Sequence, residues 1–436
     1  MNAENISSQK IFKFWVPLAA TWLMMSLEGP FLAAIIARLV EPKYNLAAYG
    51  VAFSFALIIE APVIMMMSAS TALVKDYFSF KKLRNFNFYL SGIITAIMLI
   101  LLIPTIFNFI AYNLIGLEEK VAELTYKAFF SLLPWPGAIG YRRFYQGVMI
   151  RNNLTKRVAY GTILRLASMA VTALSLYLFA KLPGAIVGAS ALSVGVSVEG
   201  LASRFMCNSV LAKIKSEESK SNLTYKEIIN FYYPLALTSL ISLGVHPLIT
   251  FFIGQSRMSL ESLAVLPVIN SLVFIFRSLA LSYQEVCIAL IGDEGENYKS
   301  VINFAKKLAI GLAVILITVS VTPISGIWFR VVSGLSKELS LFAITPTIII
   351  SIMPALTVLI SVQRAMLVKF KNTKPITYAT TIEVTVIILT LFISISYFDL
   401  IGVIAAMLAF IIGRLFSVTF LSFPYSETAR KNLHEN

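Results

Sequence analysis

Residues 14–30 of this chain read FWVPLAATWLMMSLEGP, and residues 231–247 read FYYPLALTSLISLGVHP. Aligned at an offset of 217 residues, the two stretches share seven identities in seventeen positions, including two prolines. Unrelated apolar segments of this composition share about one or two. The chain is therefore predicted to contain an internal repeat, and this repeat decides the fold.

The repeat continues through most of both halves. The most polar stretch between apolar segments, residues 213–227, separates the predicted lobes, which are residues 1–212 and 228–436. The further matched pairs, first-half residue before second-half residue, are Leu46 and Leu263, Ala47 and Ala264, Glu60 and Arg277, Gln146 and Gln363, and, one position later, Tyr160 and Tyr378, Thr162 and Thr380, and Arg165 and Glu383.

The composition indicates an integral membrane protein. Of 436 residues, 58% are hydrophobic and 13% charged, whereas soluble domains are about half apolar and a quarter charged. The mean hydropathy is +0.81. Apolar stretches of spanning length predict an all-α fold of twelve transmembrane helices, six in each lobe. These are residues 12–39, 46–73, 88–114, 126–150, 158–182, 184–211, 228–253, 263–291, 305–331, 341–368, 376–398 and 401–422.

The basic residues predict the topology and explain the net charge of +14. Twelve spans place both termini on one side, and six spans per lobe give the lobes the same orientation. The halves are therefore expected to be related by a pseudo-two-fold axis along the membrane normal, with a site between them. Because short cytoplasmic loops retain Lys and Arg, both termini are predicted to be cytoplasmic, in the inner (plasma) membrane if the protein is bacterial. The basic loops are 75–84, 151–157, 213–226, 299–307 and 369–374.

Several classes of function lack the residues they need. Two cysteines, Cys207 and Cys287, and two histidines, His246 and His434, form no metal-binding or disulfide pattern. The basic loops are too short to grip nucleic acid, and no nucleotide-binding loop occurs. His246 with scattered glutamates offers no clustered acid and base, so we expect no enzyme, no metal and no cofactor. The expected partners are the bilayer and a small organic solute, and the expected form is a monomer.

Four motifs resemble those of the multidrug and toxic compound extrusion (MATE) transporters and their wider superfamily. They are WVPLA at 15–19, YYPLA at 232–236, LAAYG at 46–50 and YQG at 145–147. The first and third also resemble motifs of the progressive ankylosis proteins of that superfamily. The resemblance implies two lobes in a V shape that rock between inward-open and outward-open states, with Na⁺ or H⁺ as the driving ion.

The chain departs from the MATE pattern in the first helix. Members of that family usually carry an aspartate late in this helix, and Glu28 is the nearest substitute here. Glu28 and Glu60 both lie within spans, and each is followed within two residues by a proline that favours a kink and frees carbonyl oxygens. Such carboxylates bind Na⁺ or a proton, so both are predicted coupling residues. A buried ion pair is the alternative.

Other ionisable and polar residues within spans are candidates for the substrate cavity, because charge at membrane depth faces a cavity or a partner. Arginine suits an anionic group, although structural pairing with the glutamates across the repeat is the favoured alternative. Four further arginines, Arg142, Arg143, Arg204 and Arg364, are expected to reach the cytoplasmic interface or to pair structurally instead. The candidates are Arg165, Glu199, His246, Arg277, Glu285, Glu383, Arg414, Gln146 and Gln363.

The sequence thus predicts a secondary active transporter. The first hypothesis is MATE-like efflux of a small organic solute or drug by alternating access, coupled to antiport of Na⁺ or H⁺. The alternative is an exporter or flippase of anionic metabolites, citrate-like or phosphorylated, or of lipid-linked precursors, which the intramembrane arginines favour.

Overall fold

The computed structural model describes residues 6–152, 154–216, 222–292, 295–370, 372 and 374–432, and these are almost entirely helical. Eleven helices, or pairs of helices joined by a short break, are long and apolar enough to cross a membrane. The chain is therefore a multi-pass integral membrane protein.

Each of the eleven candidate spans overlaps one of the twelve predicted spans. The remaining prediction, residues 126–150, falls on two shorter helices, α7 (Glu119–Ser131, 13 residues) and α8 (Trp135–Arg151, 17 residues). Pro134, which has no N–H to continue the helix, lies in the turn between them. Neither helix alone has the roughly 20 residues that a straight crossing needs.

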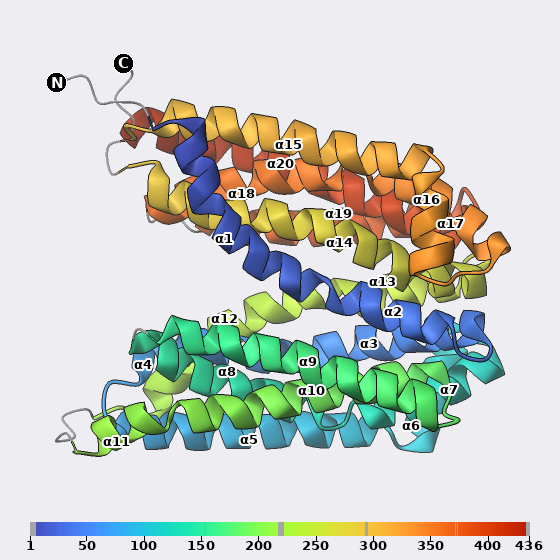
Figure 1. Ribbon diagram of the computed structural model, residues 1–436, viewed down its shortest axis with the longest axis horizontal. Helices are drawn as coiled ribbons and strands as arrows, with labels where there is room; N and C mark the ends of the chain where they lie inside the picture. The colour runs from blue at the N-terminus through green and yellow to red at the C-terminus, as the bar shows by residue number, and fades with distance from the viewer. Residues whose placement is uncertain are drawn as a thin grey trace. The chain divides into compact units, whose positions relative to one another are not determined.

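The chain forms two compact units. Unit 1 contains the described residues of Met1–Ala34 and Gln255–Asn436, and unit 2 contains Ile35–Gly254. In unit 1, α19 and α20 lie side by side, as do α9 and α10 in unit 2 (Figure 1). The helices of unit 1 are α1 (Ser8–Ser26), most of α2 (Glu28–Ala37), α14 (Ser259–Leu290), α15 (Tyr298–Val321), α16 (Ile324–Gly326), the π-helix η2 (Ile327–Val332), α17 (Lys337–Ile350), α18 (Met353–Lys369), α19 (Lys374–Ser396) and α20 (Gly402–Asn432).

Unit 2 holds the elements between α2 and α14. Besides α7 and α8, they are α3 (Pro42–Ile64), α4 (Met66–Leu73), α5 (Tyr77–Leu101), α6 (Pro104–Asn108), the π-helix η1 (Phe109–Ile115), α9 (Thr155–Phe179), α10 (Gly184–Met206), α11 (Asn208–Ser216), α12 (Tyr225–Leu243) and α13 (Val245–Gly254).

The element boundaries recur at the offset of the sequence repeat. Helix α1 begins at Ser8 and α12 at Tyr225, 217 residues later, and α2 and α13 keep this spacing. Helices α3 and α4 together cover the positions that α14 covers in the second half. Both π-helices precede the same pair of helices, α7 and α8 in one half and α17 and α18 in the other. The repeat seen in sequence is thus a repeat of structure.

The compact units and the sequence halves differ in one respect, which is that the first helix of each repeat packs with the other half. The Trp15 indole of α1 donates to Ser282 Oγ of α14 at 2.8 Å and meets the Phe304 ring of α15 edge-on. The repeat-related Tyr232 of α12 donates its hydroxyl hydrogen to the Pro62 carbonyl of α3. The aromatic residue two places before each proline therefore anchors these helices. The predicted division at 213–227 describes the repeat and stays a prediction; residues 217–221 lie outside the described part.

Prolines set the breaks in the spanning helices. Pro62 leaves the Ile58 carbonyl without its helical partner, and α3 ends two residues later, at Ile64. Helices α8 and α18 both carry a proline at their second position, Pro136 and Pro354, where the missing N–H is tolerated. The kink expected after Glu28 lies one residue before it, at Leu27.

The close contact of α4 and α8 gives a test of the packing. A Cβ added to Gly147 would lie 2.3 Å from the Met67 carbonyl oxygen, whereas one added to Gly92 on α5 meets nothing within 4 Å. We expect Gly147→Ala to destabilise the detergent-solubilised protein by about 1–3 kcal/mol, because the helices must separate. Gly92→Ala is the control and should gain up to about 1 kcal/mol of helix propensity. Equal thermal unfolding midpoints would contradict the close packing.

Candidate functional site

Four helices of unit 2 bring charged side chains together inside the span region. Glu60 comes from α3, Arg142 and Arg143 from α8, Arg165 from α9 and Glu199 from α10. The three arginines interact electrostatically with Glu60, and Arg143 also with Glu199. This unit-2 charge cluster therefore holds three arginines and two glutamates, a formal excess of one positive charge.

Glu199 is the centre of the pairing in unit 2. Its side chain is fully buried and its Oε2 lies 2.5 Å from Arg142 Nη1 and 3.5 Å from Arg165 Nε. Gln146 Nε2 donates to its Oε1 at 2.9 Å. Two guanidinium groups and an amide thus satisfy one carboxylate, which is the condition under which a buried charge is tolerated.

Glu60 is held differently from Glu199. It is buried near the middle of the span Pro42–Leu73, and Trp135 Nε1 donates a hydrogen bond to its Oε2. The Trp135 indole carries no charge, so this hydrogen bond leaves the negative charge of Glu60 in place. A carboxylate in such a setting changes the charge of the whole cluster when it takes up a cation.

Arg143 supplies the positive excess of the unit-2 cluster. Its Nη1 lies 3.6 Å from the Met67 sulfur, a weak acceptor, and its buried Nε has no hydrogen-bond partner among the described residues. Guanidinium N–H groups in this state remain able to bind an acceptor.

Unit 1 carries a second cluster on the repeat-related helices. Arg277 of α14 and Arg364 of α18 interact electrostatically with Glu383 of α19 and Arg414 of α20. Glu383 Oε1 accepts from Arg414 Nε at 2.9 Å and lies 2.8 Å from Arg414 Nη2. This unit-1 charge cluster has three arginines and one glutamate, a formal excess of two positive charges.

The two clusters use equivalent helices with opposite charges. Where α3 carries Glu60, α14 carries Arg277 at the repeat position. The ion pair between α9 and α10 has its arginine on α9, Arg165, whereas the pair between α19 and α20 has its arginine on α20, Arg414. The sign is therefore reversed at two aligned positions, Glu60 with Arg277 and Arg165 with Glu383, whereas α8 and α18 both carry arginine.

The remaining predicted site residues lie in different parts of the structure. Gln363 Nε2 of α18 donates to the Val418 carbonyl and to Ser422 Oγ, both at 3.0 Å, so it ties α18 to α20. Glu28, the first residue of α2, and His246 of α13 are partly buried, and each has an interaction partner. Glu285 of α14 is exposed and is not among the groups that interact with Arg277 or Arg364.

Three of the arginines that were expected to reach the cytoplasmic interface or to pair structurally lie within the clusters, and the pair that Arg142 forms with Glu199 fits the second expectation. Arg142, Arg143 and Arg364 join the two clusters, because acidic or hydroxyl groups on neighbouring helices draw them inward. Arg204 lies partly buried near the end of α10, bonded to Asn208. The sequence reasoning also missed Trp135, although a buried indole N–H usually needs an acceptor.

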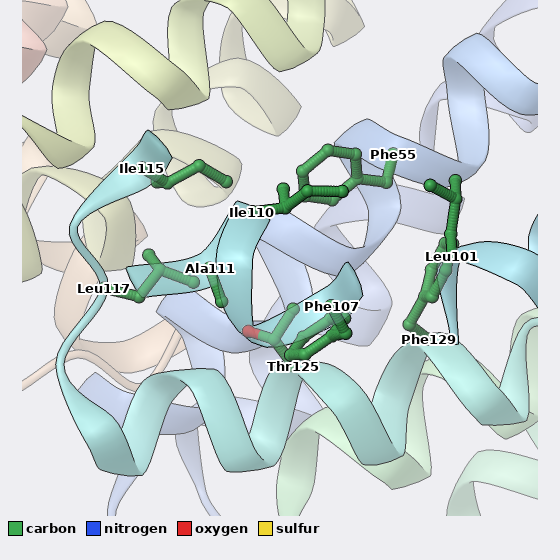
Figure 2. A pocket seen from close by; sticks show the side chains of 9 residues that line it. All are labelled: Phe55, Leu101, Phe107, Ile110, Ala111, Ile115, Leu117, Thr125 and Phe129. Atoms are coloured by element: carbon green, nitrogen blue, oxygen red, sulfur yellow. The ribbon is translucent and has the colours of Figure 1, made fainter. Parts of the chain in front are cut away.

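One small apolar cavity lies elsewhere in unit 2, between α3, η1 and α7 (Figure 2). Its volume is about 10 Å³, the room of roughly one water molecule. Phe55 and Phe129 line it, and the buried Thr125 Oγ1 there has no hydrogen-bond partner within the described residues. None of the predicted site residues lines this cavity, and it is too small for an organic solute.

Possible metal ligands do not cluster in the described part of the chain. Among the described residues, no group of three or more His, Cys, Asp or Glu side chains could hold a metal ion. The charge clusters are therefore the candidate functional sites of this chain.

Comparison with known proteins identifies the fold. No family model and no curated protein matches the sequence. Among solved structures, an inward-facing multidrug resistance MATE transporter of the MOP superfamily has a TM-score of 0.73 at 14% identity, covering 94% of this chain and 96% of that one. The lipid II flippase MurJ, in an inward closed conformation, has 0.71 at 16%, covering 94% and 87%.

A third structure differs from these in its described pocket. It is a MOP superfamily transporter from Pyrococcus furiosus, whose binding pocket is described as having reverse polarity that suggests a different function. Its TM-score is 0.65 at 13% identity, over 97% of this chain and 96% of that one. The structural resemblance to MATE transporters and to the MurJ flippase is thus confirmed at the level of the fold.

The pairing at Glu199 predicts a large effect on stability. Glu199→Gln leaves Arg142 and Arg165 without their shared carboxylate, so we expect a loss of about 3–5 kcal/mol in unfolding free energy. The control is Glu123→Gln, which breaks the exposed pair with Lys127 and should cost less than about 1 kcal/mol. Unfolding of the two variants in detergent measures both values. Similar losses would show that Glu199 is not the centre of the cluster.

Proposed function

We propose that this chain is a secondary active transporter that exports a small organic solute by alternating access, with Na⁺ or H⁺ as the coupling ion. The fold, which it shares with MATE transporters and the MurJ flippase, supports transport. The observation that carries the proposal is Glu60, a buried carboxylate near the middle of a span with a neutral hydrogen-bond donor.

Glu60 suits a coupling role for an electrostatic reason. An ionisable group at membrane depth is costly, so it is a functional candidate by default. Binding of a proton or Na⁺ at Glu60 raises the positive excess of the unit-2 cluster from one charge to two. The occupied and empty states therefore differ by one full charge in a region of low dielectric constant, where such a difference has a large energetic effect.

Two classes of solute fit this transporter. A small organic solute or drug is the first hypothesis from the sequence, and a cationic member of that class would compete with the coupling ion for Glu60. An anionic metabolite or lipid-linked precursor is the second, and the excess of arginine in both clusters favours it. The reverse-polarity pocket described for the Pyrococcus furiosus transporter shows that the polarity of the pocket varies among proteins of this fold.

Flux through proteoliposomes tests the role of Glu60. We expect Glu60→Gln to lose the part of the flux that depends on an imposed Na⁺ or pH gradient, because the neutral amide takes up no proton and lacks the negative charge that attracts Na⁺. The Gln side chain still offers an oxygen to Trp135, so the fold should persist. A cationic dye and citrate are the two probe solutes, and Glu123→Gln is the exposed control.

The outcome is decided by gradient dependence rather than by total flux. Glu60→Gln flux that still follows the gradient would refute Glu60 as the coupling residue. Glu28→Gln is then the next variant, since Glu28 is the other predicted coupling carboxylate.

A further inference from the structure

We propose that the unit-1 charge cluster is a binding site for an oxyanion, a carboxylate or phosphate group of the solute, and that Arg277 is the residue that recognises it. This inference rests on the proposed transport function and names the charge of its solute. It concerns unit 1 alone and needs no particular arrangement of the two units.

The first argument is the balance of charge. Three guanidinium groups share one carboxylate, Glu383, and that carboxylate already accepts from Arg414. Arginine stays protonated under all physiological conditions, so the cluster cannot lose its excess by releasing protons. Two uncompensated positive charges within apolar spans are expensive, and an anion of matching charge removes the cost.

The second argument is the set of free donors. Within the described residues, the Arg277 guanidinium makes no hydrogen bond and no salt bridge, and its Nε is buried. Arg364 Nη2 donates to the neutral Thr380 Oγ1 at 3.3 Å, while its buried Nε also lacks a partner. A buried Nε without a partner also occurs at Arg142, whose Nη1 pairs with Glu199. What distinguishes Arg277 is that its whole guanidinium group, and not its Nε alone, makes no hydrogen bond among the described residues, so all of its donors remain able to bind an acceptor.

The third argument is the contrast with unit 2. There the position of Arg277 is taken by Glu60, which partly balances the arginines around it. The repeat thus supplies an internal comparison in which one residue changes the charge at this position by two units. The larger excess, and hence the stronger anion site, belongs to unit 1.

The chemistry of the ligand follows from the guanidinium group. Its planar fork of N–H donors matches the two oxygens of a carboxylate or phosphate, which a halide ion cannot match. The same oxyanion group occurs on a soluble metabolite and on an acidic lipid headgroup, and these two sources need separate tests.

Thermal unfolding of the detergent-solubilised full chain gives the test. One arm adds inorganic phosphate, with sodium chloride at equal ionic strength as the salt control. A second arm adds phosphatidic acid to the micelles, with phosphatidylcholine as the lipid control. A ligand that binds only the folded state raises the unfolding midpoint, and the stabilisation grows with the logarithm of the ligand concentration divided by the dissociation constant. The variants are Arg277→Gln, Arg277→Lys and, as an exposed control in unit 1, Arg257→Gln.

The proposal makes two linked predictions for Arg277→Gln. Phosphate or phosphatidic acid should raise the midpoint of the parent protein, and the affinity should fall about tenfold or more in the variant, because a charge-assisted bidentate contact is lost. In the absence of ligand the variant should be as stable as the parent or more stable, since it removes an uncompensated buried charge. Arg277→Lys should bind with intermediate affinity, and Arg257→Gln should match the parent.

Other results would overturn the site. An oxyanion response that survives Arg277→Gln would place the anion elsewhere, and the absence of any response in both arms of the parent protein would remove the site altogether. Strong destabilisation of ligand-free Arg277→Gln would show that Arg277 is a structural partner of Glu383. A response to phosphatidic acid but not to phosphate would identify a lipid-linked solute, and the reverse a soluble one.

Binding and transport can fail independently. The binding test uses no ion gradient and no second compartment, so it does not depend on Glu60. Phosphate binding without gradient-driven flux would refute the coupling and keep the anion site, whereas flux of a cationic dye without anion binding would refute the site and keep the transporter.

Discussion

The cost of a charged side chain at membrane depth is the constraint on which the inner structure of both units depends. Each unit meets it by turning the charges of four helices toward one another, rather than toward lipid. In unit 2 the solution is nearly complete, because Glu199 satisfies Arg142 and Arg165 together. In unit 1 it is incomplete, because Arg414 occupies Glu383 and leaves Arg277 with an electrostatic neighbour but no bonded partner. The remaining charge is what distinguishes a site for a ligand from a purely structural ion pair.

The repeat makes this difference interpretable. Helices α3, α8, α9 and α10 correspond to α14, α18, α19 and α20, so the scaffold around the two clusters is the same. On that scaffold two aligned positions carry opposite charges. Glu60 aligns with Arg277, and Arg165 aligns with Glu383. Helix packing alone does not require a particular charge at each position, since an ion pair joins two helices whichever of them carries the arginine. The exchange of sign therefore needs an explanation beyond helix packing, and binding of an anion, as proposed above, supplies one for unit 1.

The sequence predicted the repeat, the helical membrane fold and eleven of the twelve spans, because these depend on long apolar runs and on identities at a fixed offset. It did not predict that Trp15 and Tyr232 anchor the first helix of each repeat to the other half, since a repeat shows which segments are alike and not which segments touch. It left Arg142, Arg143 and Arg364 open between the interface and structural pairing, because the distance from a helix end suggests the interface, while the direction of a side chain depends on partners such as Glu199 on other helices. The contacts between residues far apart in the sequence were therefore the part of the structure that the sequence did not predict.

The sign of the charge also limits how ion and solute can be coupled. A cation at Glu60 adds to the positive excess of its cluster, so it favours an anionic solute nearby and opposes a cationic one. Strict antiport, in which the ion displaces the solute, therefore suits a cationic solute, whereas an anion bound with the ion would travel in the same direction. An anion also has a driving force that needs no ion at all, because a membrane potential of 100 mV, negative inside, favours the exit of each negative charge by about 2.3 kcal/mol. For the anionic solute proposed above, the membrane potential therefore adds to the driving force of the coupling ion, and ion uptake at Glu60 makes the unit-2 cluster more favourable to an anion.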